Sequence, residues 1–263
     1  MGAESQYASV IAAVGGKAVS VSSIMNNPSV DPHSFELSPS VANEISTAQL
    51  IVQNGLGYDT FMSRVEAAAP NPRRRVIVAG RLPGLPPGNA NPHLWYSPAT
   101  MPAVAARVAS VLASLKPQLA AYFRANVRRF DRSLRPWLAV LASIRRRFPG
   151  ARVASTEPVA DLMLQAAGLS NATPLSFRLD IMNGTDPAPQ AISFEEGLVS
   201  RRQVRALVLN QQVTDSVTAA IGRLATSHAV PVVGVDETMP TRLDYAGWML
   251  QTAERLERAL AHG

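Results

Sequence analysis

The hydrophobic and polar positions alternate along the chain between short apolar runs and longer stretches with helical spacing. The short runs have the length of buried strands and lie at residues 50–53, 75–78, 152–154, 204–209 and 230–235. The stretches at 61–68 and 100–115 place apolar residues three or four apart, which is typical of amphipathic helices. Strands that alternate with helices predict an α/β fold with parallel sheets.

Three further elements are predicted from shorter patterns. Residues 4–14 have helical spacing and predict a helix. Because the order of elements then begins with a helix, we expect a first strand to lie upstream of Met1. Residues 18–24 alternate between apolar and polar positions and predict a strand. Residues 174–179 predict a second extended stretch in the later half of the chain.

The longest periodic stretch covers residues 118–148 and predicts a long helix. Pro136 lies inside this stretch and should kink or break the helix, because proline has no N–H to donate. The α/β alternation resumes after it. We therefore predict an N-terminal α/β lobe at 1–117, a linking helix at 118–148 and a C-terminal α/β lobe at 149–263. Each lobe would hold a small parallel sheet flanked by helices, with a cleft between the lobes.

Composition then narrows the classes of function. The 263 residues are 47% hydrophobic and 17% charged, which indicates a globular chain and not a disordered one. Cysteine is absent, which excludes disulfides, thiolate metal sites and thiol nucleophiles. The net charge of +6 comes mainly from arginines without interleaved aromatic residues, so we expect no nucleic-acid partner. No apolar run is long enough to predict a membrane span.

Two similar motifs present histidines beside prolines. The first is Asp31-Pro32-His33-Ser34-Phe35, and the second is Asn91-Pro92-His93-Leu94-Trp95. In each, the proline restricts the backbone just before the imidazole, and an aromatic residue two positions later can anchor the loop. A packed loop histidine is the ordinary interpretation of either motif alone. Because both follow predicted parallel strands, the two imidazoles are expected at the same edge of a sheet.

Carboxylates follow two strands of the later half in the same way. Glu157 follows residues 152–154, and Asp236 follows residues 230–235, with Glu237 competing for the role of Asp236. Glu157 could instead serve a helix N-terminus, and Asp236 could be a turn residue. Two imidazoles with two carboxylates suit Mn²⁺, Fe²⁺ or Zn²⁺. Further polar side chains could orient these ligands, namely Tyr96, Asn210 and Glu237.

The motifs together resemble a known family, the zinc/manganese solute-binding proteins of ABC metal-uptake transporters. The resemblance covers essentially the whole chain and rests on residues 31–36, 54–59, 91–95, 155–158, 210–214 and 233–238. It implies two α/β lobes joined by one rigid helix, with one divalent metal ion between them. It implies His33, His93, Glu157 and Asp236 as the metal ligands. It also implies a protein that hands its ion to an ABC transporter membrane permease.

The resemblance further implies an extracytoplasmic protein, in the periplasm or at the cell surface, and many members are lipid-anchored. The lipid-attachment cysteine is absent from this chain, and an export signal would precede Met1 in a longer precursor. We expect a monomer. Residues 80–91 lack the histidine-rich insertion of the zinc branch, and Glu157 stands where many zinc members have histidine. Both departures resemble the manganese/iron branch.

A second hypothesis uses the same metal site in a metal-dependent hydrolase. Such an enzyme needs an open coordination position and a general base near the bound water, and Glu237 could be that base. The sequence has no His-Glu-x-x-His helix, nucleophile elbow or phosphate loop. We therefore expect a binding protein and not an enzyme.

Overall fold

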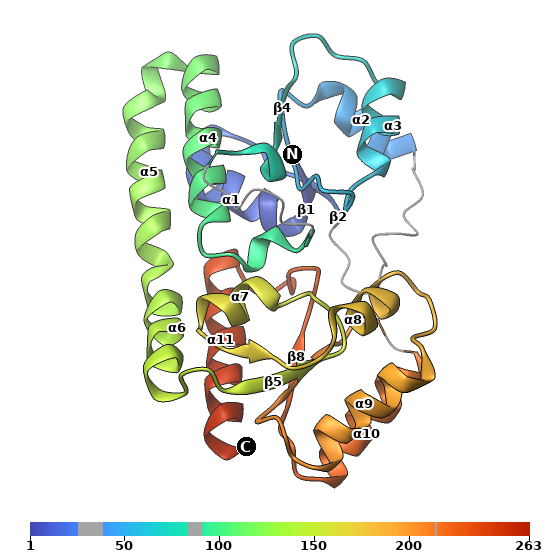
Figure 1. The fold of residues 1–263 in the computed structure, drawn as a ribbon. Helices are drawn as coiled ribbons and strands as arrows, with labels where there is room; N and C mark the ends of the chain where they lie inside the picture. The colour runs from blue at the N-terminus through green and yellow to red at the C-terminus, as the bar shows by residue number, and fades with distance from the viewer. Residues whose placement is uncertain (26–38, 84–90, 214) are drawn as a thin grey trace. The chain divides into compact units, whose positions relative to one another are not determined.

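The structure is a computed structural model that describes residues 1–25, 39–83, 91–213 and 215–263. The chain divides into two compact units, each of which contains a four-stranded parallel sheet. Unit 1 combines Met1–Arg135 with Thr238–Ala246, and unit 2 combines Pro136–Glu237 with Gly247–Gly263. Figure 1 shows the elements of both units coloured along the chain. In the described ranges, no helix is both long enough and apolar enough to cross a membrane.

The sheet of unit 1 has the strand order β2-β1-β3-β4, and all its strand pairs are parallel. Its strands are β1 (Gly2–Glu4), β2 (Ser23–Met25), β3 (Leu50–Gln53) and β4 (Arg75–Val78). Because the strands are parallel, their carboxyl ends meet at one edge, where functional loops of such sheets gather. The turn after β3 and the loop after β4 therefore begin at the same edge.

Helices cover this sheet and fill the core of unit 1. They are α1 (Ser5–Gly15), α2 (Pro39–Thr47), α3 (Phe61–Ala68), α4 (Thr100–Leu115) and α5 (Ala120–Ser133). Helix α1 packs against β1 and β3 on one side and against α4 and α5 on the other, and α4 and α5 lie side by side (Figure 1). The apolar positions of α1 and α4 recur three or four apart and are buried, which explains why these stretches form helices here.

The sheet of unit 2 has the equivalent order β6-β5-β7-β8 and is also parallel. Its strands are β5 (Arg152–Ser155), β6 (Ser170–Asn171), β7 (Leu207–Asn210) and β8 (Val232–Val235). Strand β7 therefore lies between β5 and β8, and the residues that follow these three strands share one edge. The helices of this unit are α6 (Arg135–Arg147), α7 (Asp161–Ala166), α8 (Leu175–Met182), α9 (Pro189–Ser200), α10 (Ser216–Ser227) and α11 (Tyr245–His262).

The predicted α/β class with a small parallel sheet in each half is confirmed. Four elements have the predicted bounds, namely β3, α3, β4 and α4. The long stretch at 118–148 forms a short 3-10 turn (Pro117–Leu119) followed by α5 and α6, which are interrupted at Leu134. The break comes two residues before Pro136, as expected from a residue that cannot donate a helical hydrogen bond.

Three predicted elements differ from the structure. Gly2–Glu4 forms a strand before the first helix that the sequence did not predict, because three residues are too few to give a periodic signal. Within 18–24 only Ser23 and Ile24 belong to a strand, β2. The extended stretch at 174–179 was wrong, because Leu175–Met182 is a helix that follows Pro174 and buries Phe177 and Ile181 four residues apart.

The lobe boundaries drawn from the sequence at 117/118 and 148/149 stay a prediction. The compact units divide the chain inside the predicted linking helix, between Arg135 and Pro136. They also assign Thr238–Ala246 to unit 1, where the Tyr245 hydroxyl donates to the Trp95 carbonyl at 2.6 Å and the Tyr245 N–H donates to the Ser9 hydroxyl at 3.1 Å.

Candidate metal centre

His93 lies in the loop between β4 and α4 of unit 1, directly before a 3-10 turn (Leu94–Tyr96). Its side chain is buried, with 1% of its surface exposed. The Oδ1 atom of Asn91 accepts hydrogen bonds from the His93 backbone N–H at 2.9 Å and from Nδ1 of the ring at 2.8 Å. The intervening proline fixes the backbone between these two residues. One amide oxygen therefore holds both the main chain and the ring of His93.

This pair of hydrogen bonds determines the tautomer of His93. A backbone N–H can only donate, so the Asn91 atom that it contacts must be the carboxamide oxygen. The same oxygen can only accept, so the ring nitrogen Nδ1 must carry the proton. In a neutral imidazole the lone pair is then on Nε2, which is the arrangement that metal-ligating histidines adopt when their other nitrogen donates to an oxygen.

Two aromatic rings enclose the imidazole. The centroid of the His93 ring is 5.4 Å from that of Trp95 and 6.0 Å from that of Tyr58, both in edge-to-face arrangements. The ring centroids of Tyr58 and Trp95 are 4.9 Å apart, and both residues are buried. Edge-to-face packing stabilises such rings and limits their rotation. The imidazole is therefore held by the hydrogen bond from Nδ1 to Asn91 and by packing against Tyr58 and Trp95.

Tyr58 is presented by a glycine-containing turn that follows β3. Gly55, Leu56 and Gly57 all have positive φ, at 78°, 54° and 82°. Glycine adopts this conformation readily, whereas leucine adopts it at some cost. The carboxylate of Asp59 accepts the backbone N–H of Asn54 at 2.6 Å and that of Gly55 at 2.9 Å, which closes the turn. Burial raises the pKa of Asp59, and these two N–H groups oppose the shift.

Glu4 ends β1 at this same carboxyl edge and was not singled out from the sequence. It is 2% exposed, and its two carboxyl oxygens have no hydrogen-bond partner among the residues that the structure describes. Burial, followed by the nearby charge of Asp59, raises its pKa well above the ordinary value. A three-residue strand without alternation left no sequence signal for it.

In unit 2, three polar side chains meet at the carboxyl edge of the sheet. Asn210 is the last residue of β7, Glu157 follows β5, and Glu237 follows β8; all three are at most 5% exposed. The Nδ2 group of Asn210 donates to Oε1 of Glu157 at 3.0 Å and to Oε1 of Glu237 at 2.8 Å. One amide thus joins carboxylates from the two flanking strands, which the strand order makes neighbours of β7.

The orientation of Asn210 is fixed by its own neighbours. Its Oδ1 atom accepts the backbone N–H of Gln212 at 3.1 Å, so Nδ2 is the atom that faces the carboxylates. Its backbone N–H donates to the Thr156 hydroxyl at 3.2 Å. Gln212 also accepts the backbone N–H of Glu237 through Oε1. Glu237 is therefore tied to this network through both its main chain and its side chain.

Asp236 is placed differently from its neighbour Glu237. Its side chain is partly exposed, whereas Glu237 is buried. Burial raises the pKa of Asp236, and the positive charge of Arg255 in α11 opposes this shift. Tyr96 is buried in unit 1, and its backbone N–H donates to the His93 carbonyl at 3.2 Å.

The remaining predicted ligand, His33, lies outside the described residues. The residues that the structure does describe contain no group of three or more histidine, aspartate or glutamate side chains that could hold a metal ion. Within unit 1 the structure shows an oriented His93, and within unit 2 it shows Glu157 and Glu237 joined through Asn210. Asn91 and Gln212 were missed from the sequence. The only signal for Asn91 was its position two residues before His93.

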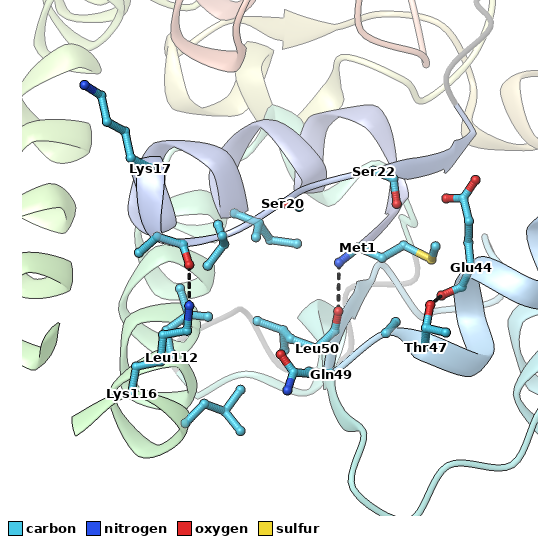
Figure 2. Close-up of a pocket in the computed structure, with 15 residues that line it drawn as sticks. Met1, Lys17, Ser20, Ser22, Glu44, Thr47, Gln49, Leu50, Leu112 and Lys116 are labelled. Carbon is cyan, nitrogen blue, oxygen red and sulfur yellow. Dashed lines mark hydrogen bonds between the residues drawn. The ribbon is translucent and has the colours of Figure 1, made fainter. Parts of the chain in front are cut away.

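A sizeable cavity in unit 1 contains none of the predicted site residues. It has a volume of about 510 Å³ and lies where β1 and β3 begin, at the opposite edge of the sheet from Asn54. Figure 2 shows the hydrogen bonds at its walls, from the Met1 amino group to the Leu50 carbonyl at 2.8 Å and from Lys116 Nζ to the Ala18 carbonyl at 2.6 Å. Burial lowers the pKa of the Met1 amino group to about 6, and Glu44 opposes that shift.

Comparison with known proteins shows which proteins this chain is similar to. The family model described as ZnuA, zinc-uptake complex component A periplasmic, matches residues 3–259. The manganese-binding lipoprotein MntA of Bacillus subtilis is 27% identical over 136 residues, which is 49% of this chain and 44% of that protein. The chain spans less than half the length of the curated relatives that it matches.

Solved structures share the fold. A variant of the Mn-bound periplasmic metal-binding protein from Candidatus Liberibacter asiaticus has a TM-score of 0.80 and 14% identity, with 98% of each chain covered. The solute-binding protein FpvC from Pseudomonas aeruginosa, in complex with Mn²⁺, has a TM-score of 0.79 and 21% identity, with 97% of this chain and 95% of that chain covered. At these identities the likeness establishes the fold.

Proposed function

This chain belongs to the zinc-uptake complex component A periplasmic family, and from that membership we propose that it captures one divalent transition metal ion and delivers it to an ABC transporter permease. The observation that carries the proposal is the state of His93. Its Nδ1–H donates a hydrogen bond to Oδ1 of Asn91, so the lone pair of the neutral ring is on Nε2, the atom that would bind a metal ion. The same hydrogen bond fixes the direction of the ring in a loop at the carboxyl edge of the sheet, where parallel sheets carry their functional loops.

We propose His33, His93, Glu157 and Asp236 as the ligands. Glu157 supports this role because Asn210 holds its Oε1 while the side chain stays at the carboxyl edge of the sheet. Glu237 is the alternative for the fourth ligand, since Asn210 holds its Oε1 as it holds that of Glu157. Asp236 lies next to it in sequence and is partly exposed, so its carboxylate is accessible to an ion.

Two imidazoles and two carboxylates form a donor set for Mn²⁺, Fe²⁺ or Zn²⁺. The pair of carboxylates favours a harder ion, which supports Mn²⁺ as the cargo. Zn²⁺ forms stronger complexes with most nitrogen and oxygen sites, so it should bind more tightly in vitro whichever ion is transported. The cargo ion is therefore best identified by metal analysis of protein taken from its native host.

The partner and the location follow from the same proposal. The family description names a periplasmic component of an uptake complex. We propose that the chain works outside the cytoplasm as a monomer. Loss of the protein should lower the cellular content of its metal, and this loss should be reversed by excess metal in the medium.

Calorimetric titration of the chelator-treated protein tests the binding function. We expect one Mn²⁺ or Zn²⁺ per chain in the wild type. His93→Ala and Glu157→Gln should each weaken binding by more than about 100-fold, because loss of a partner that only orients a ligand already costs about 10–100-fold. The matched controls are His228→Ala and Glu196→Gln, which change exposed residues of unit 2 and should bind as the wild type does.

The fourth ligand is tested by a second pair of variants. Asp236→Asn should weaken binding as strongly as Glu157→Gln. Glu237→Gln should have a smaller effect, because glutamine keeps the oxygen that accepts from Asn210. The opposite order would assign Glu237 as the ligand. A wild type that binds neither metal would refute the function, and metal-dependent ester hydrolysis lost in His93→Ala would favour the hydrolase.

A further inference from the structure

Asn54 is a completely buried amide at the end of β3, in the same unit as His93. All three of its side-chain contacts are to other parts of unit 1. Its Oδ1 atom accepts from the Tyr7 hydroxyl at 2.6 Å, and its Nδ2 atom donates to the carbonyls of Pro92 at 2.8 Å and Gly55 at 2.9 Å. Both Nδ2 hydrogens and one oxygen lone pair are therefore used.

The direction of these bonds is determined by the chemistry of the groups. A backbone carbonyl can only accept, so the atom facing Pro92 must be the amide nitrogen. The oxygen then faces Tyr7, whose hydroxyl must donate. Burial, together with the nearby charge of Glu4, raises the pKa of Tyr7 well above its ordinary value, so the hydroxyl keeps its proton at physiological pH.

The Pro92 carbonyl belongs to the peptide that leads directly into His93. A hydrogen bond to this oxygen fixes the plane of that peptide and with it the direction in which the His93 N–H points toward Asn91. Helix α1, which carries Tyr7, is packed between the sheet and two other helices and provides a rigid base. The chain of contacts runs from α1 through the end of β3 to the histidine loop.

We propose that Tyr7 and Asn54 form a positioning relay that holds His93 in the orientation and tautomer needed to bind the metal. The role of the relay in metal capture rests on the proposed function, whereas its effect on the imidazole does not. Neither residue touches the ion. The relay sets the position of the Pro92 peptide, and Asn91 then holds the ring.

Three variants test the relay. Asn54→Ala removes it, Tyr7→Phe removes only the hydroxyl, and Asn126→Ala is a matched control. Asn126 is also a buried amide of unit 1 that donates to a backbone carbonyl, that of Val14 at 2.9 Å. Its hydrogen-bonded neighbours Val14 and Arg129 lie outside the histidine loop. Thermal unfolding shows which variants are folded, and Tyr7→Phe serves if Asn54→Ala fails to fold.

The readouts are the Mn²⁺ affinity and the ¹⁵N shifts of the His93 ring in the metal-free protein. We expect Asn54→Ala to weaken Mn²⁺ binding about 10–100-fold, Tyr7→Phe to weaken it about threefold to tenfold, and Asn126→Ala to leave it unchanged. The ring shifts should report Nδ1–H in the wild type and in Asn126→Ala. They should report a mixture of tautomers in Asn54→Ala.

The outcomes separate this proposal from the function on which it rests. Folded Asn54→Ala and Tyr7→Phe proteins with wild-type affinity and ring shifts would overturn the relay, and metal capture would stand. Equal weakening in Asn126→Ala would also overturn it, because the effect would then be loss of stability alone. A wild type that binds no Mn²⁺ or Zn²⁺ would refute metal capture, whereas the ring shifts would still show whether Asn54 positions His93.

Discussion

Glu195 shows at the scale of a single residue how burial alters an acid. It lies in α9, has no exposed surface, and accepts a hydrogen bond from the Thr173 hydroxyl at 3.1 Å. Its Oε2 atom has no hydrogen-bond partner among the residues in the described ranges. Burial raises the pKa of Glu195 from 4.5 to about 7, against the opposing effects of the Thr173 hydrogen bond and Arg178.

The raised pKa predicts a pH dependence of stability. The neutral acid is tolerated in the core, so its contribution is fully present below about pH 4.5 and is lost as the pH rises through about 7. A shift of this size corresponds to about 3 kcal/mol in the free energy of unfolding. Glu195→Gln should remove this loss. In denaturant titrations, the free energy of unfolding of the variant relative to that of the wild type should therefore be higher at pH 8 than at pH 5.

The exposed neighbour Glu196 provides the control for this measurement. Glu196→Gln lies in the same helix and should follow the wild type across the same pH range. If the stability difference between Glu195→Gln and the wild type stays constant from pH 5 to pH 8, the carboxyl group does not ionise with a raised pKa, and this interpretation fails.

At the scale of an element, the last residue of strand β7 positions the polar side chains at the carboxyl edge of the sheet in unit 2. Asn210 ends β7 and holds carboxylates that follow β5 and β8. Burial and proximity both disfavour the ionised forms of two carboxyl groups on one amide, and a divalent cation bound there would favour them. Under the proposed function, this strand end would hold the two groups where a cation could bind.

We predict that Asn210→Ala lowers the affinity for Mn²⁺ about 10–100-fold, because Glu157 loses the partner that orients it. The matched control is Asn171→Ala. Asn171 ends β6 in the same sheet and donates to the Ser155 hydroxyl at 2.7 Å and the Asp161 carboxylate at 2.9 Å. Neither Glu157 nor Glu237 is among its hydrogen-bond partners in the described residues. Competition titrations with a chromogenic chelator should separate the two variants; equal affinities would remove Asn210 from the site.

At the scale of the whole molecule, the chain is organised as two units that contain the proposed ligands in separate parts of the sequence. His93 belongs to unit 1, and Glu157 and Asp236 belong to unit 2, whereas His33 lies outside the described residues. A ligand that binds only the folded protein stabilises it by about 2.7 kcal/mol at 100 times its Kd. Metal held by residues of both units should therefore stabilise both.

Hydrogen exchange with and without Mn²⁺ tests this linkage. The amides of β3 in unit 1 and of β7 in unit 2 should both exchange more slowly with metal, and the melting temperature should rise by roughly 5–8 °C. His93→Ala should remove both effects. Protection of one strand without the other would mean that a single unit holds the ion and that the four-ligand set is wrong.

The sequence by itself determined the α/β class, the bounds of elements such as Leu50–Gln53 and Thr100–Leu115, and the break near Pro136. These follow from apolar spacing, strand length and proline chemistry, which act over a few residues. It also put His93, Glu157 and Asp236 after strands, where parallel sheets carry their functional loops. Local patterns sufficed for all of these features.

Only the tertiary structure decided which side chains meet. The strand order places β7 between β5 and β8, and this is why Asn210 joins Glu157 to Glu237. Packing of α1 against the sheet brings Tyr7 to Asn54, and Asn54 to the histidine loop. Hydrogen bonds between residues tens of positions apart depend on strand order and helix packing, which no local pattern of residues specifies.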